Sequence, residues 1–215
     1  MEDLEVPISA NDVLLGTAIA DATLRRRSLN QNASIRVGHS IDKAEYVFWK
    51  YKHLRKLVEI RNFNMIEGGR YRRSPNDYVF FQSVSSPVLT EVRELVYQNG
   101  RKTISDEFLS RVNETVLAVW FMDDGSYGSH PNSMNYTLST DAFTFAENER
   151  LAQFLTSKFD LSPRLQHIKR SDRWVIRFLK HDSPKIENLI GNCVNQVSCM
   201  KYKLASSHGA DGLVA

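Results

Sequence analysis

Two aspartates close apolar segments that lie almost half a chain apart. Asp21 follows the apolar part of LLGTAIADA (residues 14–22), and Asp124 follows that of LAVWFMDDG (residues 117–125). Each segment has the composition of a buried helix, and a carboxylate at a helix C-terminus costs roughly 0.3–1 kcal/mol because that end carries partial negative charge. A divalent cation would offset this cost, since Mg²⁺ typically takes one or two protein carboxylates together with water and phosphate oxygens.

An alternative interpretation is that both segments are ordinary core helices whose terminal acids are simply solvated. The same arrangement at two duplicate positions favours the metal-binding interpretation. Gly16 and Ala20 lie four residues apart, so these small residues share one face of the first helix and would let a second helix approach closely. If the two helices pack side by side, we expect their carboxylates to lie near each other.

The elements around each acid repeat in the same order, which indicates an internal duplication and a molecule with pseudo-two-fold symmetry. Arg25–Arg27 is expected to be a basic turn, and the last two strands a hairpin. Hydrophobic periodicity and turn residues predict helices at 13–24, 41–60, 87–99, 115–123, 143–159 and 184–194, and strands at 34–37, 78–84, 134–139, 163–168 and 173–179.

The two acid-ended segments resemble the paired LAGLIDADG motifs of homing endonucleases. The second, LAVWFMDDGS, is closest to the single-chain, two-motif, intron-encoded type of the mitochondrial omega intron, and the similarity covers about residues 13–204. The resemblance implies an α+β fold: a duplicated, pseudo-two-fold αββαββα LAGLIDADG fold with a saddle-shaped antiparallel sheet in each half. We expect half-domains at residues 1–101 and 102–205, and a disordered tail at 206–215.

In this family the motif helices form the interface between the halves, and the last acid of each motif binds metal beside the scissile phosphates. By position these acids are Asp21 and Asp124. Ala20 and Asp123, one place earlier in each motif, are expected as secondary members of the metal sites. Ala22 stands where the motif often has glycine. Val119 and Trp120 replace small residues, so the helix contact should be less close on that side.

The family usually supplies one lysine in each half to stabilise the charge that develops during phosphodiester hydrolysis. Lys102, in GRKTI, and Lys203, in MKYKL, resemble these lysines. The alternative for each is an ordinary exposed lysine.

Basic residues follow both motifs and are expected to face DNA from the two sheets. Alternate strand residues share a face, and a two-stranded ribbon fits the major groove, where arginine recognises guanine and glutamine recognises adenine. The alternative is a solvated charged surface. The expected DNA-binding residues are Arg25, Arg26, Arg27, Arg36, Arg70, Tyr71, Arg72, Arg73, Arg164, Gln166, Lys169, Arg170, Arg173 and Arg177.

Several other features bear on partners and setting. The basic residues Lys50, Lys52, Arg55 and Lys56 are assigned with equal weight to phosphate steering or to solvation. The six histidines show no zinc-like spacing, and no Walker loop or dinucleotide fingerprint occurs. Two cysteines, a net charge of +3 and no apolar run of membrane length indicate an intracellular protein without a membrane partner.

We therefore expect a monomeric, metal-dependent DNA endonuclease that cuts both strands of a long asymmetric duplex and promotes intron mobility. Mg²⁺ is the expected cofactor, with Mn²⁺ able to substitute and Ca²⁺ supporting binding without efficient cleavage. The resemblance implies an organelle or a prokaryotic cytoplasm. Because no splicing blocks flank the motifs, we do not expect an intein. The alternatives are a maturase that binds intron RNA, and a non-catalytic DNA-binding protein of the same fold.

Overall fold

The computed structural model describes residues 7–66, 77–128 and 135–208 and contains the expected duplication. Each repeat has the order αββαββα. The first consists of α1 (Ala10–Ile19), β1 (Thr23–Arg25), β2 (Ser34–Ser40), α2 (Ala44–Leu54), β3 (Ile60–Ile66), β4 (Tyr78–Ser83) and α3 (Pro87–Val96). The second consists of α5 (Glu114–Asp124), β7 (Gly125–Tyr127), β8 (Tyr136–Leu138), α6 (Phe145–Phe159), β9 (Pro163–Ile168), β10 (Arg173–Phe178) and α7 (Ser183–Val194).

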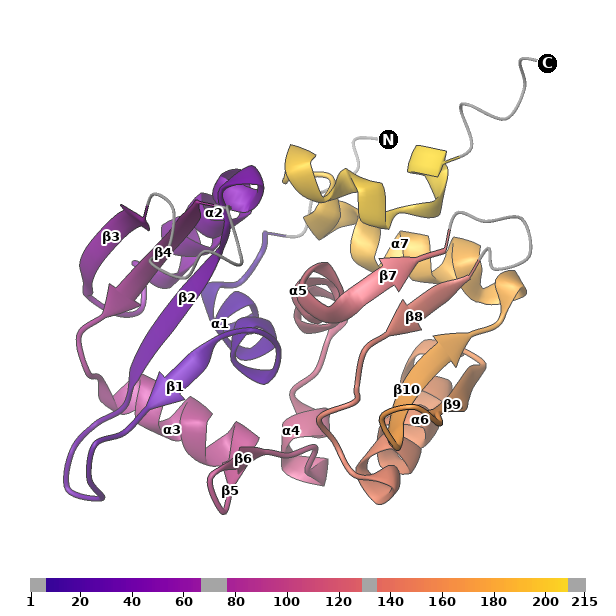
Figure 1. Ribbon diagram of the computed structural model, residues 1–215, viewed down its shortest axis with the longest axis horizontal. Coiled ribbons are helices and arrows are strands. Elements are labelled where there is room, and N and C mark those ends of the chain that lie inside the picture. The colour runs from indigo at the N-terminus through magenta and orange to yellow at the C-terminus, as the bar shows by residue number, and fades with distance from the viewer. Residues whose placement is uncertain (1–6, 67–76, 129–134, 209–215) are drawn as a thin grey trace.

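The two sheets have the same strand order, which confirms the α+β prediction. Their orders are β1-β2-β4-β3 and β7-β8-β10-β9, and every pairing is antiparallel. The sheets lie to the two sides of α1 and α5, which stand side by side in the middle of the molecule (Figure 1). The ends of the two motif helices are thereby brought between the sheets.

The motif helices pack closely because one of them carries a glycine at the contact. A Cβ atom on Gly16 would lie 2.7 Å from the Val116 carbonyl oxygen and 2.7 Å from the Val119 Cβ. The expectation that Val119 loosens this contact is therefore wrong, because its side chain occupies the space that Gly16 leaves. Both helices are apolar on almost every side and are buried along most of their length, so their packing contributes strongly to the core.

A linker and a C-terminal segment join the repeats. The linker contains the strands β5 (Tyr97–Gln98) and β6 (Arg101–Lys102) and the helix α4 (Asp106–Ser110). After α7 the chain forms two 3₁₀ helices, η4 (Ser198–Lys203) and η5 (Ala205–His208), and two more occur at η1 (Ile41–Lys43) and η3 (Lys180–Asp182). Glu45 of α2 accepts hydrogen bonds from the backbone nitrogens of Ser198 and Cys199, each 2.9 Å long, which ties η4 to the first repeat.

Some predicted boundaries are wrong. The predicted helix 13–24 ends at Ile19, because the chain turns through Ala20 and Asp21 into β1, and the helix predicted at 41–60 ends at Leu54 and is followed by β3. Strands β1 and β7 are three residues long, too short for alternation to show in the sequence. Residues 206–208, expected in a disordered tail, belong to η5, and the rest of that tail lies outside the described residues.

Candidate metal centre and nucleic-acid face

Asp21 lies just beyond the end of α1, and its side chain is 47% exposed. The second residue near it is His39, whose Nδ1 lies 3.7 Å from Asp21 Oδ2. The other ring nitrogen of His39, Nε2, lies 3.4 Å from Oδ1 of Asp123. Asp21, His39 and Asp123 each place one possible ligand atom within 4.8 Å of the others. Sequence reasoning missed His39, because it stands in a strand far from any other histidine.

Asp123 is completely buried and is held by a cation from the other repeat. Lys50 Nζ donates to both Asp123 carboxylate oxygens at 2.7 Å, and neither side chain is exposed. Burial by itself would raise the pKa of Asp123, but the Lys50 ammonium and His39 outweigh it and hold that pKa at about 2. The assignment of Lys50 to phosphate steering or solvation is therefore wrong. A signal was present in the sequence, because Lys50 lies four residues after Tyr46 and four before Leu54, on the face of α2 that is buried.

Asp124 is the last residue of α5 and lies in a largely enclosed position. Trp120, one turn earlier, donates from Nε1 to Asp124 Oδ2 at 3.1 Å. Burial raises the pKa of Asp124 to about 7, and the negative charges of Asp21 and Asp123 add to this effect.

Each predicted lysine contacts the carbonyl groups at the end of one motif helix. Lys102 Nζ donates to the carbonyl oxygen of Ala20. Lys203 Nζ donates to the carbonyl oxygens of Asp123 at 3.1 Å and Gly125 at 2.7 Å. Burial lowers the pKa of Lys102, and it lowers the pKa of Lys203 to about 8. Both ammonium groups offset the partial negative charge of a helix C-terminus.

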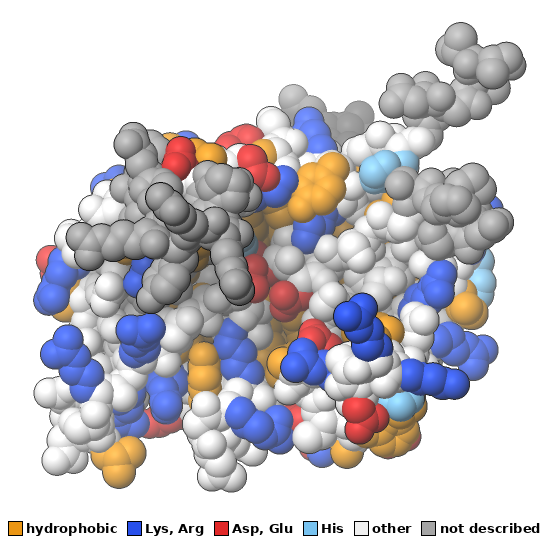
Figure 2. Space-filling view, in the orientation of Figure 1, with side chains coloured by type: hydrophobic (Ala, Val, Ile, Leu, Met, Phe, Trp, Pro, Cys, Tyr) orange, Lys and Arg blue, Asp and Glu red, His pale blue; other side chains and the backbone are white. Residues whose placement is uncertain are grey.

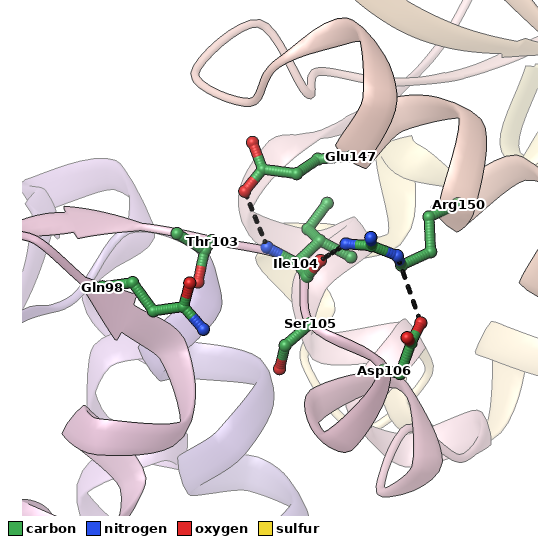
Figure 3. Close-up of a pocket in the computed structure, with 7 residues that line it drawn as sticks. All are labelled: Gln98, Thr103, Ile104, Ser105, Asp106, Glu147 and Arg150. Carbon is green, nitrogen blue, oxygen red and sulfur yellow. Dashed lines mark hydrogen bonds and ion pairs between the residues drawn. The ribbon is translucent and has the colours of Figure 1, made fainter.

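Lys102 is carried by a linker segment that the second repeat holds tightly. Glu147 at the start of α6 accepts from the Ile104 backbone nitrogen at 3.2 Å and from Arg101 Nη1 at 2.9 Å. Arg150 donates from Nη1 to the Ile104 carbonyl oxygen at 2.8 Å and pairs with Asp106 (Figure 3). These contacts fix the linker on α6 directly after Lys102.

The charges of the centre fit a divalent cation. Three carboxylates, those of Asp21, Asp123 and Asp124, influence one another, while Lys50 compensates Asp123 alone by direct contact. Hard oxygen ligands of this kind suit Mg²⁺ or Mn²⁺. Among the described residues, Lys50 pairs directly with both oxygens of Asp123, whereas no lysine pairs directly with the carboxylate of Asp21 or of Asp124.

The first sheet and the loop between β1 and β2 line a polar groove. Arg25 and Arg27 line it as the sequence predicts, and Arg61 and Gln82 join them from β3 and β4. Sequence reasoning missed Arg61, because no strand was predicted between the helix at 41–60 and the strand at 78–84; Gln82 lies on the predicted strand 78–84. The remaining lining residues are Gln31, Asn32, Ser34, Ser83, Val84 and Ser85.

Other predicted residues of the first repeat lie elsewhere. Arg26 donates to the Gln31 carbonyl oxygen at 2.8 Å and pairs with Glu94 at 2.8 Å, so its guanidinium shapes the loop between β1 and β2. Arg36 stacks over Phe80, with its guanidinium carbon 4.1 Å from the ring centroid. The four residues predicted at 70–73, Arg70, Tyr71, Arg72 and Arg73, lie outside the described residues.

The second sheet presents its predicted residues on one hairpin. β9 and β10 pair with Arg164 opposite Arg177 and Gln166 opposite Val175, so these residues share a face. Arg173 on the same strand pairs with Asp141 at 2.6 Å. Lys169 and Arg170 occupy the exposed hairpin turn. In Figure 2, Lys and Arg side chains are scattered over both halves of the molecule, and acidic side chains gather between the halves.

Comparisons with known proteins agree with this geometry. The profile of the LAGLIDADG DNA endonuclease family matches residues 11–186. The homing endonuclease I-WcaI, solved bound to its DNA recognition sequence, has a similar fold, with a TM-score of 0.79 at 21% identity over 93% of this chain and 88% of that one.

Two curated relatives are informative in different ways. A probable intron-encoded DNA endonuclease 3 of Mycosarcoma maydis is 32% identical over 130 residues, covering 58% of this chain and 91% of its own length. A protein RecA of Mycolicibacterium chitae is 25% identical over 214 residues, covering 94% of this chain and 48% of its own length. The chain thus spans about half the length of the first curated relatives that it matches.

Within the described residues, no helix combines the length and apolar character needed to cross a membrane.

Proposed function

The chain belongs to the LAGLIDADG DNA endonuclease family, and from this premise we propose that it is a site-specific endonuclease that cuts both strands of a long asymmetric DNA duplex. One observation carries the proposal: the ends of α1 and α5 bring acidic side chains, the buried Lys203 and the partly buried Lys102 together between two sheets that carry basic side chains. A nuclease requires this combination, because phosphates must be attracted by positive charge and metal must be held where they are cut.

Asp21 and Asp124 would hold the divalent ions, and Ala20 would border the first of them. A bound ion supplies a nucleophilic water at neutral pH and neutralises the phosphate that is cut. Lys102 and Lys203 would place positive charge beside the developing phosphorane, since both ammonium groups are fixed at the helix ends. The role expected for Asp123 as a secondary metal ligand is replaced here by that of a positioning residue, because Lys50 already satisfies both of its oxygens.

We propose Mg²⁺ as the ion in the cell, with Mn²⁺ as a substitute. Both accept carboxylate oxygens in octahedral geometry. Ca²⁺ should support DNA binding without efficient cleavage, because its larger and looser coordination shell activates water poorly.

The proposed partner is double-stranded DNA bound by a monomer, because one chain carries both motifs. The DNA-bound I-WcaI structure and the intron-encoded relative support this partner and a role in intron mobility, inside an organelle or a prokaryotic cell. The RecA relatives do not change the proposal, because the sequence contains no Walker loop to bind a nucleotide. The alternative is an intron RNA maturase, and the experiment must distinguish it from a DNA endonuclease.

The test is selection of cleaved products from a randomised duplex library with Mg²⁺, with Asp21→Asn and Asp124→Asn proteins in parallel. The proposal predicts one recovered site that the unaltered protein cuts and that the variants at most nick. Failure to cut any duplex, together with enrichment of intron RNA in a parallel binding selection, would replace the nuclease by the maturase.

A further inference from the structure

His39 occupies a place where its two ring nitrogens face two different carboxylates. Nδ1 is 3.7 Å from Asp21 Oδ2, and Nε2 is 3.4 Å from Asp123 Oδ1. The first distance is too long for a hydrogen bond. It is, however, within the separation of two ligands that share one ion, since bonds of roughly 2.0–2.2 Å to each ligand allow a spacing up to about 4 Å.

The second carboxylate is fixed so that it can orient the ring. Lys50 donates to both oxygens of Asp123, and neither group is exposed. The His39 ring also packs against buried Tyr46, with ring centroids 5.4 Å apart, and Lys50 Nζ lies 4.2 Å from the same Tyr46 ring. Histidines that bind metals almost always turn their other nitrogen to a carboxylate or a carbonyl group. Asp123 stands in that position.

The second repeat lacks this arrangement at the equivalent places. His39 precedes the first residue of α2 by five positions, and Thr140 precedes the first residue of α6 by the same five. Thr140 is buried and bonded within its own repeat to Asn148. Lys50 likewise corresponds to Leu151, each six positions into its helix. Among the described residues, the imidazole is therefore a feature of the first half of the centre.

We propose that His39 is a nitrogen ligand of the divalent ion at Asp21, oriented through Asp123 and Lys50, so that this half of the centre binds transition-metal ions such as Mn²⁺ more tightly than the half at Asp124. Imidazole nitrogen is a softer ligand than carboxylate oxygen and favours such ions over Mg²⁺. The inference rests on the proposed function only in taking Asp21 as a metal ligand.

The experiment uses Mn²⁺ alone, added to the full chain without DNA, and records pulsed electron paramagnetic resonance. The expected spectrum contains the modulation of a directly bound imidazole ¹⁴N, and protein labelled with ¹⁵N-histidine should replace it by the ¹⁵N pattern. His39→Gln should remove the modulation and weaken Mn²⁺ binding about 10–100-fold. Thr140→Ala is the matched control at the equivalent position and should retain the modulation.

Asp123→Asn tests the orienting role separately. It should keep the nitrogen modulation and lower Mn²⁺ affinity by about 10–100-fold, because the ring loses its charged partner. The proposal is overturned if the unaltered protein shows no nitrogen modulation, or if the modulation survives in His39→Gln. Since no DNA is present, such a result leaves the nuclease proposal standing. A protein that shows the signal but cuts no duplex would reject the nuclease and retain the His39 site.

Discussion

The two motif helices end in chemically different surroundings although the fold around them is duplicated. At the end of α1, Asp21 is half exposed and is preceded by the small residue Ala20. At the end of α5, Asp124 is largely enclosed and is preceded by a second acid, Asp123, which is fully buried. The first end is open to solvent and ligands, whereas the second inserts a charge into the interface between the repeats.

The difference shows how a duplicated protein can become asymmetric without changing its topology. Asp123 replaces the alanine of the other motif, and its charge is tolerated because Lys50 and His39 of the opposite repeat face it. At the equivalent positions of the second repeat stand Leu151 and Thr140. An uncompensated buried carboxylate would be very costly, so these three differences depend on one another.

The largest effect should come from breaking the buried pair. Lys50→Met would leave Asp123 charged and unpaired in the interior and should lower the free energy of unfolding by about 3–5 kcal/mol. Leu151→Met, at the equivalent position, should cost less than about 1.5 kcal/mol. Urea denaturation of both variants measures the contrast. Equal losses of unfolding free energy in the two variants would mean that the Lys50–Asp123 pair contributes no more to stability than Leu151 does.

Asp124 should make the metal-free protein less stable as pH rises. Its pKa is about 7 in the folded protein and close to its ordinary value of 3.8 in the unfolded chain. Between these two pH values the folded protein keeps a proton that the unfolded chain has lost. Stability should therefore fall across this window, by at most roughly 4 kcal/mol. Asp124→Asn should be more stable than the unaltered protein at pH 8 and equal to it at pH 3.5.

Thermal unfolding in the presence of a chelator measures this difference, and Asp21→Asn is the control in the more exposed half. If Asp124→Asn raises the stability by the same amount at every pH, ionisation of the Asp124 carboxyl group is not the source of the pH dependence.

Weakening the contacts that hold the linker on α6 should have an intermediate effect on stability and cleavage. Glu147→Gln weakens the contacts to Arg101 and Ile104 and should cost about 1–3 kcal/mol of stability. Because Lys102 would then be held less firmly at Ala20, cleavage should slow by about tenfold while DNA affinity stays close to normal. Glu149→Gln, exposed on the same helix, is the control. If Glu147→Gln lowers stability but leaves the cleavage rate unchanged, the Glu147 contacts do not position Lys102 for cleavage.

Much of the fold could be predicted from the sequence because the repeats carry strong signals. The apolar segments before Asp21 and Asp124 and the alternating strands of the second repeat predict the duplicated topology. Interior polar contacts between repeats could not be predicted. Lys50 lies on an otherwise amphipathic helix, and nothing in its own repeat shows that Asp123 will face it.

The candidate site divides in the same way. Lys102 and Lys203 could be located because their surroundings resemble those of the family's lysines, and the structure brings both lysines to the helix ends. His39 could not be located from the sequence, because no other possible metal ligand stands at a recognisable spacing from it. Arg26 shows the converse, since this basic turn residue is used to hold its own loop against Glu94 of α3.

The smallest effect concerns the two basic faces. Arg61→Ala in the first sheet and Arg177→Ala in the second should each reduce the slope of log affinity against log salt by about 1, because each arginine is expected to displace about one counterion from DNA. Arg55→Ala, directly after the end of α2, should leave the slope unchanged. Fluorescence anisotropy at several salt concentrations checks this. A change for only one sheet would mean that the other does not face DNA.

The central claim is that both helix-end acids are needed to cut the two strands. Strand-resolved cleavage of the selected target in Mg²⁺ tests it most directly, with the unaltered protein, Asp21→Asn and Asp124→Asn compared in single turnover. We predict that each variant loses double-strand cleavage while binding the target within about tenfold of normal affinity, because the acids hold metal and do not read sequence. A variant that cuts both strands at the normal rate would contradict the account.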